Sequence, residues 1–138
     1  MSFKESITLR YIKIITPNLN RSKSLHESSK HALKTALEIQ LSPYSNKTIL
    51  RELYESLREL CEAIGYKHGF KFQSHESIMY FLKDELNEIK IATKFNKYRV
   101  LRNDINYYGK NINLETVIKA KQEIPEIIKK LETHLLKK

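Results

Sequence analysis

Apolar residues three and four positions apart recur along this sequence, which is the spacing of one face of an α-helix. The clearest stripe lies in residues 50–64 and consists of Leu50, Leu53, Leu57, Leu60, Cys61 and Ile64. The 138 residues include only three glycines and three prolines, so few positions interrupt a helix. The pattern therefore predicts a helix-rich fold, with one helix that runs to about Lys67 and stops at Gly69.

Four further segments are predicted to be helical. The first covers residues 18–41, before Pro43, and its core-facing stripe is Leu25, Ser29, Ala32, Leu33, Ala36 and Leu37. The second begins after Ser74, a suitable N-cap residue, and we expect it to bury Ile78, Leu82, Leu86 and Ile89.

The other two predicted helices lie further along the chain. One spans about residues 94–108 and ends at Gly109. The last begins after Asn113, and we expect Pro125 to kink it near Lys121, whose carbonyl loses its partner. The core face of this last helix is expected to consist of Val117, Ile118, Ile124, Ile128, Leu131 and Leu135.

Short links between these segments predict an all-α fold, an up-and-down antiparallel bundle of about five helices. We expect residues 1–138 to form a single domain. Residues 1–17 fit either a short helix or an extended segment, because their apolar positions partly alternate, and Pro17 ends the segment in both cases.

Composition narrows the functional classes. No apolar run reaches the ~18 residues of a membrane span, and the first residues do not resemble a secretory signal, so we expect a cytoplasmic protein without a membrane partner. Cys61 is the single cysteine, and His26 and His31 lie five positions apart rather than four, so neither a disulfide nor a metal site is expected. No nucleotide-cofactor glycine motif occurs, so we predict no cofactor.

The formal net charge is +9, and the surplus is concentrated in residues 90–110. The basic residues of this segment are Lys90, Lys94, Lys97, Arg99, Arg102 and Lys110. Asp104 is the one acidic residue between them. Such a local surplus favours a polyanionic partner such as RNA. The alternative is that the lysine-rich composition reflects genome bias or thermal adaptation rather than binding.

A helical wheel separates the residues of this segment into two faces. Tyr98, Leu101, Ile105 and Tyr108 fall within one arc of about 80°, and Arg99, Arg102, Asn103 and Asn106 fall within another of about 100°. The first face can pack on a core, whereas the second offers guanidinium and amide groups to phosphate and to base or sugar edges. The predicted nucleic-acid-binding residues are Lys97, Arg99, Arg102, Asn103, Asn106, Tyr107, Tyr108 and Lys110.

Three motifs give the sequence a family resemblance. Arg102-Asn103-x-x-x-Tyr107-Tyr108-Gly109 resembles the Arg-Asn-x-x-x-His-x-Tyr signature of HEPN domains, and more closely the archaeal branch that has Arg-Asn-x-x-x-Tyr-Tyr-Gly. The segment from Leu53 to the Gly-Tyr-Lys ending at Lys67 is similar to the long second helix of that family. Ser74-His75-Glu76 is similar to the start of its next helix, so the resemblance covers about residues 18–136.

The resemblance implies a dimer in which two such motifs face each other, and an RNA site with Arg102, Asn103 and Tyr107 in the catalytic positions. Tyr107 stands where the active ribonucleases have histidine, and tyrosine, with a pKa of ~10, is a poor base near neutral pH. We therefore expect binding of RNA or nucleotide phosphate, while metal-independent cleavage stays open. On a straight helix, Arg102 and Tyr107 are about 140° apart. His75 could replace the missing histidine if it lies near Arg102, or it could be a capping or packing residue.

The family often acts in toxin–antitoxin or defence systems beside a minimal nucleotidyltransferase. The resemblance therefore also leaves an alternative function, a non-enzymatic helical dimer that docks such a nucleotidyltransferase. It further implies that an acidic or polar residue from an earlier helix approaches Arg102. The candidates are Glu52, Glu55, Glu59 and Glu62, which could instead form an ordinary helix surface with Arg51 and Arg58.

Overall fold

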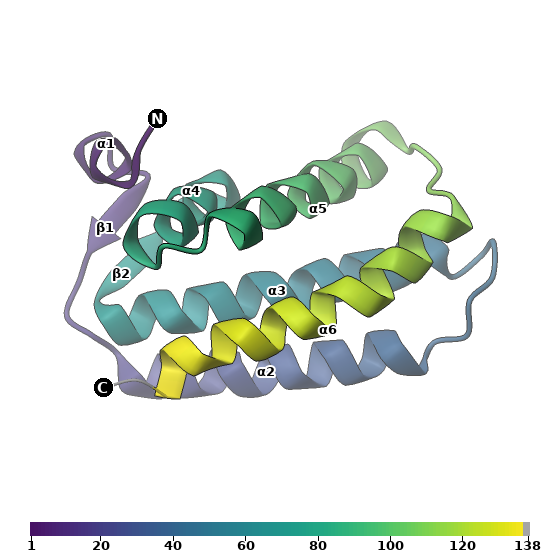
Figure 1. Ribbon diagram of the computed structural model, residues 1–138, viewed down its shortest axis with the longest axis horizontal. Helices are drawn as coiled ribbons and strands as arrows, with labels where there is room; N and C mark the ends of the chain where they lie inside the picture. Colours follow the sequence, from purple (N-terminus) through teal and green to yellow (C-terminus); the bar gives the residue numbers. More distant parts are fainter. Residues whose placement is uncertain (137–138) are drawn as a thin grey trace.

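The computed structural model describes residues 1–136. Its elements are α1 (Phe3–Thr8), β1 (Ile12–Ile14), α2 (Leu19–Glu38), α3 (Asn46–His68), β2 (Phe70–Phe72), α4 (His75–Tyr80), the π-helical segment η1 (Phe81–Glu85), α5 (Ile89–Tyr108) and α6 (Leu114–Leu136). The four long helices α2, α3, α5 and α6 run alternately in opposite directions (Figure 1). The predicted all-α antiparallel bundle is confirmed.

Helix α3 forms the centre of the bundle, and α2, α5 and α6 pack around it (Figure 1). The predicted stripe is fully buried at Leu50, Leu53, Leu57, Leu60, Cys61 and Ile64. The helix ends as predicted at Gly69, whose φ of +87° lies in the left-handed region. A Cβ at this position would lie 2.8 Å from the carbonyl oxygen of Ile15, so both the backbone conformation and the space require glycine.

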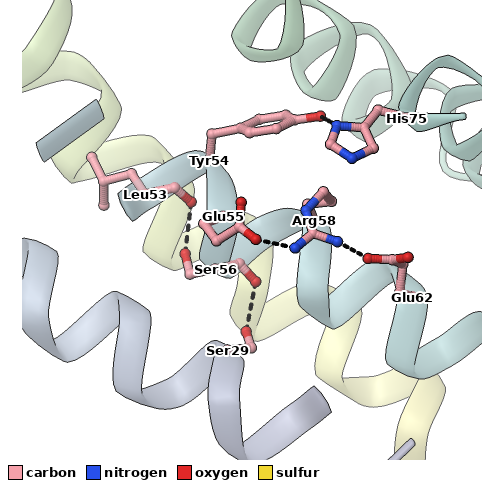
Figure 2. A network of polar contacts seen from close by, with 8 residues as sticks. All are labelled: Ser29, Leu53, Tyr54, Glu55, Ser56, Arg58, Glu62 and His75. Atoms are coloured by element: carbon pink, nitrogen blue, oxygen red, sulfur yellow. Dashed lines mark hydrogen bonds and ion pairs between the residues drawn. The ribbon is translucent and has the colours of Figure 1, made fainter. Parts of the chain in front are cut away.

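Small residues allow α2 to pack closely on α3. The hydroxyl groups of Ser22 and Ser29 are buried, and each donates a 2.6 Å hydrogen bond to a carbonyl oxygen of α3, that of Ala63 and that of Ser56 respectively. Figure 2 shows the bond from Ser29 to Ser56. The predicted stripe of α2 was too wide, because Leu37 at its edge is 42% exposed.

The N-terminal segment contains both of the structures that its sequence left open. Ser2 caps the short helix α1, and the chain then extends into β1. Strand β1 pairs antiparallel with β2, with Ile12 opposite Phe72. Strand β2 was not predicted, because three residues carry too little alternation and their pairing partner is distant in sequence.

The boundary between the third and fourth predicted helices was wrong. Ser74 caps α4 as predicted, since its hydroxyl accepts a hydrogen bond from the backbone N–H of Ser77. After η1, however, Asn87 adopts a φ of +57°, and α5 begins at Ile89 rather than near residue 94. Asparagine tolerates this left-handed conformation, which ends the preceding turn. Ile89 therefore lies outside the core and is 64% exposed.

Helix α6 begins as predicted, because the side chain of Asn113 accepts a 2.8 Å hydrogen bond from the backbone N–H of Thr116. The helix continues through Pro125 to Leu136. Ile118, expected in the core, is 38% exposed because it lies at the edge of the stripe. Among residues 1–136, no helix is both long and apolar enough to span a bilayer.

Candidate functional site

An open pocket of about 300 Å³ lies between α5 and the start of α4. Five of the residues singled out from the sequence line it: His75, Arg99, Arg102, Asn103 and Tyr107. Ser74 and Glu76 complete its lining. The structure therefore brings His75 to the same pocket as Arg102, which is the arrangement on which its candidate role depends. We call this hollow the arginine pocket.

Two guanidinium groups of the arginine pocket lack acidic partners. Nη1 of Arg102 donates a 3.2 Å hydrogen bond to Oδ1 of Asn103, and the guanidinium lies 5.7 Å from the centre of the Tyr54 ring. Nε and Nη2 of Arg99 donate to Oδ1 of Asn96 at 3.1 and 2.9 Å. Within residues 1–136, no carboxylate forms an ion pair with either arginine. Both charges are therefore available to an anion.

A third arginine close to this site is already neutralised. Arg58 on α3 donates to the carboxylates of Glu55 and Glu62, one helical turn away on either side (Figure 2). The expected i, i+4 partnership of Arg58 with Glu62 is thus confirmed. Arg51 behaves differently, because its Nε donates a 2.7 Å hydrogen bond to Oδ1 of Asn106. In the described chain, none of the four glutamates considered from the sequence pairs with Arg102.

His75 is held by a buried tyrosine. Its Nδ1 lies 3.1 Å from the hydroxyl of Tyr54. Figure 2 shows this contact between α3 and α4. The pKa of His75 is lowered to about 4, mainly by burial and also by the positive charges of Arg58, Arg102 and Arg99, while Glu55 opposes the shift. Burial raises the pKa of Tyr54, although the charges of Arg102 and Arg58 oppose this. Near neutral pH the imidazole is therefore neutral and the phenol keeps its proton.

Tyr107 lies at the open side of the arginine pocket, with 72% of its surface exposed. A straight helix places Arg102 and Tyr107 on different faces, and the structure nevertheless brings both to one pocket.

Four of the predicted binding residues do not line this pocket. Asn106 is bound by Arg51, and the ammonium group of Lys97 lies 5.1 Å from the ring centre of Tyr98. Lys110 lies 4.0 Å from a carboxylate oxygen of Asp104 and 6.0 Å from the ring centre of Tyr108. Tyr108 was expected on the buried face but is 74% exposed, since the last turn of α5 extends beyond the core.

Tyr54 is the residue that the sequence analysis missed. It lies on the buried face of α3 and is fully buried, so its position alone indicates a core aromatic. The available signal was its hydroxyl, because a buried tyrosine usually finds a hydrogen-bond partner. Which partner it finds depends on the packing of α4 against α3, and this is not encoded near Tyr54 in the sequence.

The arginine pocket combines two uncompensated guanidinium groups with an amide, a phenol and a neutral imidazole, which together are suited to an anion that accepts several hydrogen bonds. Over the described residues, no cluster of three histidine, cysteine or acidic side chains could hold a metal ion. The sequence matches no protein-family model, and comparison with curated proteins and with solved structures finds no match.

Proposed function

We propose that this protein binds RNA or nucleotide phosphate in the arginine pocket. The observation that carries the proposal is the pair Arg99 and Arg102, half-buried side by side on α5 with no ion-pair partner in the described part of the chain. A phosphate supplies the bidentate acceptors that guanidinium groups prefer. The net charge of +9 and the HEPN-like Arg102-Asn103 motif support a polyanionic ligand.

The proposal is one of binding, and cleavage is a secondary possibility within it. Metal-independent RNA cleavage needs a group that exchanges protons near neutral pH. Tyr107 replaces the histidine of the motif, and the pKa of His75 is about 4 before a ligand is bound. A bound phosphate would raise the pKa of His75 towards neutrality, because a nearby negative charge favours the imidazolium form. A role in a toxin–antitoxin or defence system belongs to the same proposal.

Replacement of Arg102 with alanine should weaken RNA binding and reduce its dependence on salt. Each phosphate contact to a single strand contributes about 0.7 to the slope of log K against log salt concentration, because counterions are released. We expect Arg102→Ala to lower the slope by about that amount. Fluorescence anisotropy with a single-stranded RNA over a salt series measures it, and the same metal-free samples can be scored for cleavage.

Arg21→Ala is the matched control for this experiment. Arg21 also lies over a tyrosine ring, 5.5 Å from the centre of Tyr66, but it is on α2 and does not line the arginine pocket. Arg21→Ala removes the same charge and the same type of ring contact as Arg102→Ala. We expect it to change the salt dependence of RNA binding less. Lys137, whose replacement we also expect to matter less, lies outside the described residues. Equal effects of Arg102→Ala and Arg21→Ala, or no RNA affinity at low salt, would contradict the proposal.

Exposed apolar surface on α5 favours the alternative function, a helical dimer that docks a nucleotidyltransferase. Val100, Tyr107 and Tyr108 are 42%, 72% and 74% exposed. Exposed aromatic residues of this kind are enriched at protein interfaces. In this alternative, a two-fold interface includes part of residues 95–110, and the same surface or the one beside it receives the partner protein.

Light scattering tests the dimer directly. We expect a homodimer at tens of micromolar protein, and we expect Tyr108→Ser to shift the population towards monomer because it removes an exposed ring from the proposed interface. Tyr44→Ser is the control, since Tyr44 is 95% exposed and lies in the loop before α3. A wild-type protein that remains monomeric at these concentrations would count against both the dimer and this docking surface.

A further inference from the structure

A second hollow lies next to the arginine pocket. It has a volume of about 200 Å³ and lies between the N-terminal segment and α4, where Ser6, Tyr11, Ser77 and Tyr80 contribute to its walls. Ser74 and Glu76 line both hollows, so the two meet at these side chains. We call the second hollow the tyrosine pocket. A ligand with two chemically different parts could occupy both pockets at once.

The tyrosine pocket offers aromatic rings and one carboxylate. Tyr11 is 45% exposed and Tyr80 is half-buried, so the pocket presents ring surface on which a flat group can pack. Glu76 is exposed, and its Oε1 accepts a 3.4 Å hydrogen bond from the hydroxyl of Tyr80. No basic side chain in residues 1–136 forms an ion pair with Glu76. The carboxylate can therefore accept hydrogen bonds from a ligand.

The charged groups of the two pockets differ. Arg99 and Arg102 outweigh the shared carboxylate of Glu76 in the first and make it suitable for an anion, whereas no arginine or lysine of residues 1–136 lines the second. Burial and Glu76 raise the pKa of Tyr80, and the charge of Arg99 opposes this. A nucleotide would accordingly place its phosphate on the arginines and its base in the tyrosine pocket.

We propose that the tyrosine pocket binds the guanine base of a nucleotide whose phosphate lies on Arg99 and Arg102. This inference rests on the proposed function. A carboxylate has only acceptors, and it can bind two adjacent donors at once. Guanine offers such a pair, N1–H and the N2 amino group. Adenine and cytosine each place an acceptor nitrogen beside their amino group, and uracil has a single N–H between two carbonyls. Guanine is therefore the RNA base that can donate two adjacent hydrogen bonds to the carboxylate of Glu76.

Calorimetry with three nucleotides tests this selection. The probes are the monophosphates of guanosine, inosine and adenosine, each as the 3′ and the 5′ isomer. We expect guanosine monophosphate to bind about tenfold more tightly than adenosine monophosphate, since a good bidentate contact discriminates by about 5- to 150-fold. Inosine monophosphate, which keeps N1–H but lacks the amino group, should lie between them. Glu76→Gln should remove most of the preference for guanosine.

Glu5→Gln is the control for charge. Glu5 is exposed on α1 and its charge acts on Tyr80, but it does not line the tyrosine pocket. It should alter the affinities of all three nucleotides equally and leave the guanosine preference unchanged. Nucleotide binding that depends on Arg102 but has no base preference, or a preference that survives Glu76→Gln, would overturn the guanine inference alone. Absence of binding by all nucleotides and by RNA would overturn the proposed function as well.

Discussion

Truncation of Leu60 to alanine should lower the free energy of unfolding by about 2–5 kcal/mol. Leu60 is fully buried at the centre of α3, the helix that α2, α5 and α6 surround. The substitution removes buried apolar surface and leaves a cavity that the three surrounding helices can close only in part. Urea denaturation followed by circular dichroism measures the loss, which is a large part of the stability of a typical domain.

Leu37→Ala provides the comparison for this prediction. It deletes the same atoms from a helix, but Leu37 is 42% exposed on α2. We expect it to cost less than about 1 kcal/mol, because surface substitutions have small effects. If Leu60→Ala and Leu37→Ala lowered the free energy of unfolding by similar amounts, the conclusion that α3 lies at the centre of the core would be wrong. Leu57→Ala, at another fully buried site of the same helix, should behave like Leu60→Ala.

Acid should destabilise the folded protein through His75. Its pKa falls from 6.5 to about 4 on folding, so the unfolded chain takes up a proton first as the pH decreases. Stability from this group is complete above pH 6.5 and is lost progressively as the pH falls towards 4. Since the side chain is half-buried, solvent reduces the effect, and we expect a loss of about 1–3 kcal/mol over this range. Denaturation at a series of pH values measures it.

His75→Gln and His31→Gln separate this effect from general acid sensitivity. The first should flatten the dependence of stability on pH below 6.5, and the second should not, because His31 is exposed on α2. NMR of the His75 ring gives an independent reading, with a titration midpoint near 4 in the free protein. A midpoint close to 6.5 would show that the ring is not buried beside the arginines. Added nucleotide should move the midpoint upward if phosphate binds in the arginine pocket.

Helices and their caps could be predicted because they depend on neighbouring residues. The stripe of α3, the cap residue Ser74 and the left-handed stop at Gly69 are all local signals, and the structure contains each of them. Prediction was poorer at the edges of stripes and at the start of α5. There, the turn at Asn87 and the exposure of Ile89 depend on how η1 packs rather than on periodicity.

The candidate site was predictable where it depends on residues that are close together in the sequence. Arg99, Arg102 and Asn103 share one face of α5 because of helical spacing alone, and they line one pocket. His75 was linked to them by a resemblance and not by any spacing, since α4 and α5 are separate helices. Asn106, on the same predicted face, is bound by Arg51 from α3 and does not line the arginine pocket.

The sequence by itself determined the helical class, the position of the basic face and most helix ends, because these follow from contacts between residues a few positions apart. Tertiary structure alone decided that Tyr54 binds His75, that Arg58 takes two glutamates and leaves Arg102 without one, and that β1 pairs with β2. Each of these contacts depends on side-chain conformations or on packing between segments. The pattern of the sequence restricts such contacts but does not select among them.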